Sequence, residues 1–219
     1  MNTLKHTKLV KRNRLSKKAF EIELVRPSDF EFIPGQNIRF IYGDIERYYS
    51  IISAPHEPTI ALCVRFVQEG VFCKVLANAK PGFDFQFTGP HGYFTYKSSK
   101  RPPVFIATGT GIAPFVSMAR SGITHFTLLH GVSCTEDLYY ESFFRKTASR
   151  FIPCISDSIP EDSGLPDIFY GRVTDFIRNE LPRTEYDFYL CGRGEMVRDV
   201  TLLADELFPG SFVYNEVFF

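Results

Sequence analysis

The sequence has no tryptophan, no net charge and no long apolar segment, and the last two absences exclude whole classes of protein. Lys and Arg together number 25, as do Asp and Glu, so no overall field attracts nucleic acid or an anionic membrane. No apolar run reaches the roughly 18 residues of a membrane-spanning helix, and the basic start lacks the apolar core of a signal peptide. We therefore expect a cytoplasmic protein that binds neither nucleic acid nor membranes.

Cysteine is scarce and irregularly placed. The five cysteines are an odd number, lie far apart and form no C-x-x-C pair. Neither a disulfide framework nor a zinc or iron–sulfur site fits that spacing. We therefore expect reduced thiols and no bound metal.

The zero net charge conceals a basic beginning. Residues 1–18 carry seven basic side chains and no acidic one, so the rest of the chain has 18 basic against 25 acidic side chains. This segment could steer an acidic partner protein. A solvated strand and turn is an equally good interpretation of it.

Phenylalanine and tyrosine are abundant, with 23 and 11 copies, and both favour strands. In residues 1–98, apolar and polar residues alternate over 20–25, 38–42 and 83–87, with Pro- and Gly-containing turns between these runs. One short helix is expected at 71–78, where apolar residues share a face. Several short strands separated by turns predict an antiparallel β-barrel.

The pattern changes after residues 97–103, which read as a linker. Short apolar runs then alternate with helical patterns, which predicts βαβ units and a doubly wound parallel sheet. We therefore expect two domains, a β-barrel at 1–98 and an α/β domain at 103–219. In the α/β domain we expect strands at 104–107, 125–129, 151–155, 186–190 and 212–217, and helices ending near 120 and spanning 136–146, 173–179 and 196–207.

A glycine-containing turn follows the first strand of the α/β half, at Thr108-Gly109-Thr110-Gly111. Because glycine has no Cβ, a pyrophosphate can approach this main chain closely, and N–H groups at the following helix start would point at it. The pattern is G-x-G-x-x-P and not the G-x-G-x-x-G dinucleotide fingerprint, so a simple tight turn is an equally good interpretation. Cys191 ends another strand and would lie at the same edge of the sheet, or simply be a buried small residue.

Six motifs in order resemble those of the ferredoxin–NADP reductase superfamily, in which a barrel domain binds FAD and a sheet domain binds the nicotinamide nucleotide. The resemblance covers about residues 5–219 and implies an FAD-dependent NAD(P)H oxidoreductase. The motifs are Arg47-Tyr48-Tyr49-Ser50 for R-x-Y-S, 70–76 for G-x-x-[ST]-x-x-L, 89–92 for G-P-x-G, 109–114 for the nucleotide loop, Cys191-Gly192 for C-G, and Glu216-Val217-Phe218 for the terminal acid-x-aromatic.

For the first domain, the resemblance implies that R-x-Y-S binds FAD. Arg47 would contact the pyrophosphate, since a guanidinium fork suits paired phosphate oxygens. Tyr49, beside Tyr48, would lie along the flavin or its ribityl chain, and Ser50 would hydrogen-bond near flavin N5. Without the resemblance, Arg47 reads as a solvated strand charge and Tyr49 as a core residue.

The helix expected at 71–78 is implied to hold an FAD phosphate. Main-chain N–H groups of Val71, Phe72 and Cys73, after Gly70, would bind it as a helix N-terminus can. Cys73 replaces the Ser or Thr of the family, and a thiol is a weaker hydrogen-bonding group. Unusually tight FAD binding is therefore not expected.

For the second domain, the resemblance implies that residues 108–111 hold the pyrophosphate of the nicotinamide nucleotide. Cys191, Gly192 and Glu216 would border the nicotinamide. Phe218 stands where the family places an aromatic ring on the flavin, and Phe219 could share or take that role. A C-terminal strand anchored by apolar residues is the alternative.

The preference between NADH and NADPH is expected to depend on the end of the third strand. There Ser156-Asp157 replaces the Ser-Arg pair with which NADPH-dependent relatives hold the 2′-phosphate. A carboxylate would repel that phosphate and could accept hydrogen bonds from the ribose of NADH. Gly131-Val132-Ser133 also lacks the Arg of the family's G-x-R, so we favour NADH. Arg145, Arg150 or Arg172 could supply the missing cation.

The implied reaction passes hydride from NAD(P)H to FAD and then electrons to a separate protein such as ferredoxin or flavodoxin. One alternative is a reductase subunit of an oxygenase or another multiprotein redox complex. A second is a non-enzymatic nucleotide- or flavin-binding module. No catalytic triad or metal site is visible, and His91, His125 and His130 are expected to be structural.

Overall fold

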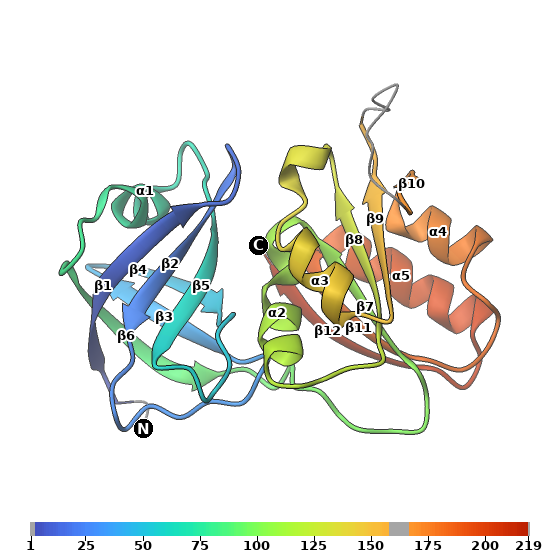
Figure 1. Ribbon diagram of the computed structural model, residues 1–219, viewed down its shortest axis with the longest axis horizontal. Coiled ribbons are helices and arrows are strands. Elements are labelled where there is room, and N and C mark those ends of the chain that lie inside the picture. The colour runs from blue at the N-terminus through green and yellow to red at the C-terminus, as the bar shows by residue number, and fades with distance from the viewer. Residues whose placement is uncertain (1–2, 158–166, 219) are drawn as a thin grey trace. The chain divides into compact units, whose positions relative to one another are not determined.

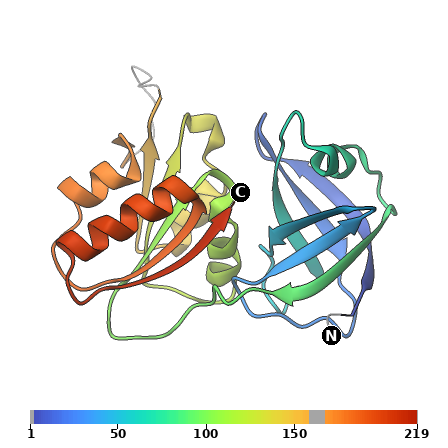
Figure 2. The same ribbon diagram turned by 180° about the vertical axis from the view of Figure 1, so that it is seen from behind.

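The computed structural model describes residues 3–157 and 167–218. Contacts divide the chain into two compact units, Met1–Tyr96 with Ala113–Gly122, and Lys97–Ile112 with Ile123–Phe219. Each unit has its own β-sheet (Figures 1 and 2). The domain limits of 1–98 and 103–219 stay a prediction, because the segment after Ile112 groups by its contacts with the first unit.

The described residues of the first unit form a six-stranded antiparallel sheet in the order β4-β3-β6-β1-β2-β5. Ile51, directly after β4, bridges to Leu62 in β5. The two edge strands therefore meet, and the sheet closes into the predicted barrel. Its elements are β1 (Lys5–Arg14), β2 (Ala19–Val25), β3 (Asn37–Tyr42), β4 (Ile45–Ser50), β5 (Thr59–Arg65), α1 (Val71–Asn78) and β6 (Asp84–His91).

Phenylalanine fills the barrel in the period of two that strands impose. Ile38 and Phe40 on β3, and Phe85 and Phe87 on β6, are at most 3% exposed, whereas Gln86 between the last two is exposed. The ring of Phe40 lies 5.4 Å from that of Phe85, centroid to centroid. The alternation noted in the sequence is therefore the alternation between core and solvent.

The second unit contains a six-stranded sheet, among the described residues, in the order β10-β9-β8-β7-β11-β12 with every pair parallel. Helix α3 lies on one face and helices α4 and α5 on the other (Figures 1 and 2), which confirms the doubly wound prediction. Its strands are β7 (Pro103–Thr108), β8 (Thr127–Val132), β9 (Arg150–Ile155), β10 (Phe169–Tyr170), β11 (Asp187–Arg193) and β12 (Phe212–Phe218).

The helices of the second half follow the prediction with one correction. The helix predicted at 136–146 begins later, at Glu141, because Tyr140 before it has a φ of 58°, a left-handed conformation that interrupts a helix of L-residues. The strand predicted from 125 begins at Thr127, since His125 has a φ of 60°. The observed helices are η1 (Gly109–Ile112), α2 (Ala113–Arg120), η2 (Thr135–Asp137), α3 (Glu141–Thr147), α4 (Val173–Asn179) and α5 (Gly194–Leu207). Within the described ranges, none is long and apolar enough to cross a membrane.

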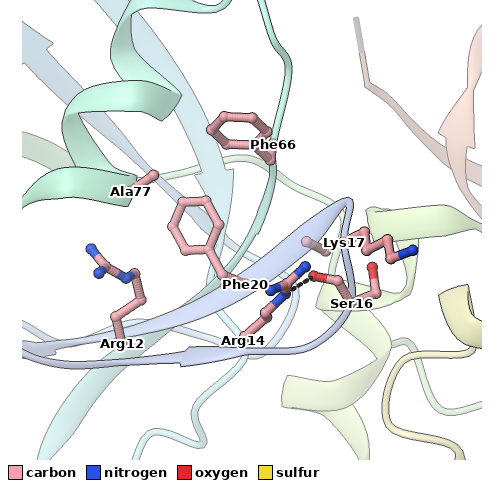
Figure 3. A pocket seen from close by; sticks show the side chains of 8 residues that line it. Arg12, Arg14, Ser16, Lys17, Phe20, Phe66 and Ala77 are labelled. Atoms are coloured by element: carbon pink, nitrogen blue, oxygen red, sulfur yellow. Dashed lines mark hydrogen bonds between the residues drawn. The ribbon is translucent and has the colours of Figure 1, made fainter.

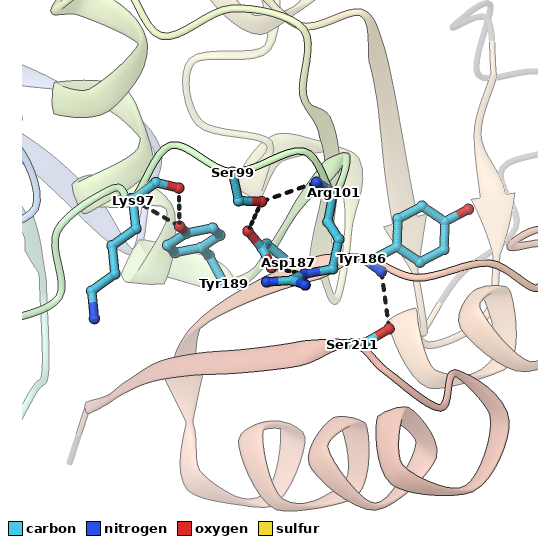
Figure 4. Close-up of polar contacts among 7 residues, drawn as sticks. All are labelled: Lys97, Ser99, Arg101, Tyr186, Asp187, Tyr189 and Ser211. Carbon is cyan, nitrogen blue, oxygen red and sulfur yellow. Dashed lines mark hydrogen bonds and ion pairs between the residues drawn. The ribbon is translucent and has the colours of Figure 1, made fainter.

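The segment that reads as a linker is attached to the second sheet (Figure 4). Asp187, 1% exposed at the start of β11, accepts hydrogen bonds from Ser99 Oγ at 2.5 Å and Arg101 Nε at 2.7 Å. The Arg101 guanidinium also lies 4.2 Å from the centroid of the Phe212 ring. A buried carboxylate with a cation and a hydroxyl as partners therefore holds residues 97–101 against the strands.

Candidate functional site

The R-x-Y-S motif lies on β4, with alternate side chains on opposite faces. Arg47 and Tyr49 are opposite Phe40 and Ile38 of β3, so their side chains start on the same side of the sheet. The ring of Tyr49 packs on that of Phe40, 5.8 Å away, whereas Arg47 is exposed and donates from Nη1 to the carbonyl of Glu46 at 2.7 Å. Burial, together with the nearby Cys73, raises the pKa of the Tyr49 hydroxyl. That hydroxyl is therefore protonated at neutral pH and available as a hydrogen-bond donor.

The start of α1 lies beside the same face. The ring of Phe72 is 5.2 Å from that of Phe40 and 6.3 Å from that of Tyr49. The residue before the helix, Gly70, provides no side-chain cap, and the first N–H groups of any helix have no intrahelical acceptor. The structure thus brings two motifs more than 20 residues apart together, and leaves helix N–H groups for an anion.

Cys73, in place of the expected Ser or Thr, is directed toward the main chain before the helix. Its thiol donates to the carbonyls of Val67 at 3.0 Å and Gly70 at 3.2 Å. A Cβ at Gly70 would lie only 2.7 Å from the Cys73 sulfur. The thiol therefore supports the loop that leads into α1.

The remaining residues of the motif face the other side of β4. Tyr48 is 57% exposed, and its ring lies 5.7 Å from the ring of His91. Burial and the nearby Arg39 lower the pKa of His91. Ser50 is 3% exposed. His91 belongs to the G-P-x-G motif, so a third motif adjoins the first.

In the second unit, the two glycine-containing strand ends interlock. A Cβ at Gly111 would overlap the carbonyl of Cys191, and a Cβ at Gly192, whose φ is 141°, would overlap Thr108 Oγ1. That same oxygen accepts the Arg193 N–H at 3.0 Å. Only glycine permits this approach of two loops at the carboxyl edge of a parallel sheet, where such folds bind ligands.

At Gly109 the backbone conformation, and not close packing, favours glycine. Its φ of 53° is left-handed, and the space around its Cβ position is open. Its carbonyl accepts a hydrogen bond from Nε2 of His130, at 3.0 Å, from the adjacent strand β8. His130 is fully buried, and burial lowers its pKa to about 4, so the ring is neutral at pH 7.

The sequence predicts a merely structural role for His130, but this contact connects it to the glycine loop at 108–111. The contact follows from the register of β7 and β8, in which His130 lies opposite Ala107, the residue directly before the loop. Register between strands over 20 residues apart is not readable from a single sequence.

Cys191 and Glu216 lie opposite each other on β11 and β12. Cys191 is fully buried, and burial together with Glu216 raises the pKa of its thiol. The thiol is therefore protonated at neutral pH and unsuited to attack as a thiolate. Phe218, the last residue of β12, is paired through its main chain with Arg193, and Phe219 lies outside the described residues.

Ser156 and Asp157 follow β9 and are exposed. Their N–H groups donate to the carbonyls of Val132 and Ser133 at 3.1 and 3.2 Å, and Ser156 Oγ donates to the Asp157 carboxylate at 2.8 Å. Three strand steps separate β9 from β11, about 14 Å at the usual spacing. The carboxylate and Cys191 therefore lie on either side of the glycine loop along one edge.

Strand β1 makes up most of the basic beginning of the chain, and some of its basic side chains bind groups within the unit. Arg12 Nη1 donates to the carbonyls of Leu76 and Ala79 at the end of α1, where a cation is favourable. Arg12, with Arg14 and Lys17, also lines a groove of about 400 Å³ (Figure 3). Its steering of an acidic partner stays a prediction.

Comparison with known proteins identifies both halves. The oxidoreductase FAD-binding domain family matches residues 6–96, and the oxidoreductase NAD-binding domain family matches residues 105–201. The toluate 1,2-dioxygenase electron transfer component of Pseudomonas putida is 32% identical over 212 residues, which are 90% of this chain and 62% of that protein. Ferredoxin–NADP reductase B of Sorangium cellulosum is 32% identical over 195 residues, 80% of each chain. The chain thus spans about three fifths of the first relative.

Solved structures share the fold. A ferredoxin NADP+ reductase from Neisseria gonorrhoeae, solved with bound FAD and NADP, superposes with a TM-score of 0.86 at 22% identity and covers 100% of both chains. The Amycolatopsis cytochrome P450 reductase GcoB gives 0.86 at 24% identity, over 100% of this chain and 71% of that one. At these identities the likeness concerns architecture, and it matches the barrel followed by a parallel sheet.

Proposed function

Because the chain belongs to the ferredoxin–NADP reductase superfamily, we propose that it is a flavoprotein oxidoreductase that oxidises NADH and delivers the electrons to a separate acceptor. The observation that carries the proposal is the interlocked pair of glycine loops, with Gly111 against Cys191 and Gly192 against Thr108. This packing joins two strand-end loops at the carboxyl edge of a parallel sheet, where such folds bind dinucleotides, and the open space at Gly109 leaves room for a pyrophosphate beside the main chain.

We assign FAD to β4 and the start of α1. Arg47 would bind the pyrophosphate, together with N–H groups of Val71, Phe72 and Cys73. Tyr49 would donate its hydroxyl, which its raised pKa keeps protonated. The buried Ser50 would hydrogen-bond near flavin N5. The meeting of Phe72 and Tyr49 around Phe40 supports this assignment.

Residues 108–111 would hold the nicotinamide nucleotide by its pyrophosphate, with Cys191, Gly192 and Glu216 at its nicotinamide. FAD held at β4 and the start of α1 would supply the hydride-accepting and electron-transferring chemistry, singly or in pairs of electrons. Cys191 would provide a neutral contact surface, since its thiol remains protonated. We propose Phe218 or Phe219 as the aromatic that covers the flavin.

We propose NADH as the preferred donor. Asp157 lies exposed where the 2′-phosphate of NADPH would be recognised, and a carboxylate repels that phosphate. Two of the alternative cations already have partners, because Arg145 Nε donates to Glu141 at 2.8 Å and the Arg150 guanidinium lies 5.3 Å from the centroid of the Phe176 ring. Arg172 is exposed at the start of α4 and is the competing cation to test.

The acceptor we propose is a ferredoxin or flavodoxin. A second candidate is a component of a multiprotein oxygenase, favoured by relatives that are named electron transfer components of toluate and 2-halobenzoate 1,2-dioxygenases. Co-purification with an oxygenase component, and dependence of turnover on it, would select the second. We also propose a cytoplasmic location, supported by the thiol form of all five cysteines.

The first test is a visible spectrum of the purified protein, followed by separate anaerobic additions of NADH and NADPH. We expect a yellow protein that NADH bleaches faster than NADPH. Faster bleaching by NADPH would overturn the donor preference alone. A colourless protein that cannot be reconstituted with FAD would overturn the enzyme proposal in favour of a non-enzymatic binding module.

Two substitutions test the origin of the donor preference. Asp157→Asn should narrow the ratio of NADH to NADPH efficiency by about tenfold, the effect of removing one close like-charge contact. Arg172→Gln, which removes a charge of the opposite sign from the competing cation, should leave the ratio unchanged. A loss of NADPH activity confined to Arg172→Gln would show that this cation holds the 2′-phosphate.

A further inference from the structure

His130 occupies an unusual position for a histidine. It is completely buried in the middle of the second sheet, and among the described residues its Nδ1 has no hydrogen-bond partner. Within the part of the chain that the structure describes, the hydrogen bond of the ring is the one from Nε2 to the carbonyl of Gly109, at 3.0 Å. A phenylalanine would fill similar space without an unpaired buried nitrogen. Burying the imidazole therefore lowers the stability of the folded protein locally, and what the ring contributes in return is its hydrogen bond to the Gly109 carbonyl.

The bond defines how the loop peptide is oriented. A carbonyl only accepts hydrogen bonds, so the proton of the neutral ring must be on Nε2. The peptide between Gly109 and Thr110 is trans, since the single cis bond among the described residues is Gly89-Pro90. In a trans peptide the N–H points opposite to the carbonyl. Holding the Gly109 carbonyl toward the buried ring therefore turns the Thr110 N–H away from it.

We propose that His130 is a positioning residue for the nicotinamide nucleotide: it holds the Gly109–Thr110 peptide so that the Thr110 N–H faces the pyrophosphate. This inference rests on the proposed function, because it deepens the role of the same loop. The left-handed φ of Gly109, 53°, makes the bond more important. Glycine has many accessible conformations, and the space around it is open, so packing alone does not define this peptide.

The test uses FAD-loaded protein and ADP-ribose, which carries the pyrophosphate without nicotinamide. His130→Phe should weaken ADP-ribose binding, measured by calorimetry, by about tenfold, the effect of one misplaced hydrogen-bond donor to a charged group. The KM for NADH should rise by a similar factor with kcat nearly unchanged. His130→Gln retains a donor at the end of its side chain and should restore most of the affinity.

A matched control separates positioning from packing. Phe144→Leu removes a fully buried ring from α3 that packs on Phe126 and Phe151. It should lower the unfolding midpoint and leave ADP-ribose binding unchanged. If Phe144→Leu and His130→Phe weakened ADP-ribose binding equally, the inference would be overturned, because any loosening of the sheet would then be enough to weaken binding.

Two further outcomes are decisive. Nitrogen NMR of the wild type should find the His130 proton on Nε2, and a proton on Nδ1 would overturn the inference even if the variants do not fold. Wild-type binding of ADP-ribose with an unchanged affinity in His130→Phe refutes the role of His130 alone. A wild type that binds neither ADP-ribose nor NADH refutes the proposed function itself.

Discussion

Gly111→Ala tests whether the two interlocked loops form the dinucleotide site. The added Cβ would lie 2.6 Å from the carbonyl carbon of Cys191 and 2.7 Å from the Cα of Gly192, where ordinary contact begins near 3.4 Å. The carbonyl oxygen of Cys191 is nearer still, and every atom that the Cβ meets is main chain, so the loops must separate by about 1 Å. Overpacking of this kind costs about 1–3 kcal/mol, which lowers the unfolding midpoint by about 2–12 °C.

The effect on turnover should be larger than the effect on stability. A displacement near 1 Å at a binding loop can cost about 100-fold in rate, so we expect kcat/KM for NADH to fall by about 10- to 100-fold. Stopped-flow reduction of bound FAD by NADH measures this. Reduction by dithionite, which needs no nucleotide site, should be unchanged.

Gly194→Ala is the matched control for Gly111→Ala. Its Cβ would lie 3.5 Å from Val217 Cγ1, an ordinary contact, at the first residue of α5. Alanine at such a helical position is neutral or stabilises by about 0.4–1 kcal/mol. If Gly111→Ala retained wild-type NADH kinetics, the loops would not form the dinucleotide site; equal losses in both variants would show general sensitivity of this edge.

Three more results follow from single contacts. Arg101→Met should destabilise the protein to urea more than Asp187→Asn, because it leaves the carboxylate of Asp187 buried without its cation, whereas Arg101 can reach water; the reverse order would contradict this. Cys73→Ser should tighten FAD binding about threefold in a titration of the apoprotein, since a hydroxyl is a stronger donor than a thiol to the carbonyls of Val67 and Gly70; weaker binding would mean that the hydroxyl does not reach them. Lowering the pH should destabilise the wild type more than it destabilises His130→Phe. The pKa of His130 is about 4 in the folded protein and 6.5 in the unfolded chain. The stability that the neutral ring contributes above pH 6.5 is therefore lost as the pH falls toward 4, by up to about 3 kcal/mol. Parallel urea curves for the two proteins between pH 7.5 and 5 would refute this.

The sequence by itself determined those features of the protein that depend only on residues close together along the chain. Alternation in runs such as 38–42 predicts a strand with one buried face, and α1 and α4 begin and end at the predicted residues, 71–78 and 173–179. The family motifs also consist of short runs, so their presence and order are readable without coordinates. Periodicity and glycine content depend only on neighbouring residues, so both can be seen directly in the amino-acid sequence.

Only the tertiary structure decided which distant residues meet. The neighbouring positions of β7 and β8 bring His130 to the Gly109 carbonyl, and the approach of β11 to β7 leaves no room for a Cβ at Gly111. The left-handed φ of Tyr140 delays the start of α3 to Glu141, five residues later than the sequence predicts. Strand order, register and such backbone conformations follow from the packing of the whole sheet, which no short window of sequence contains.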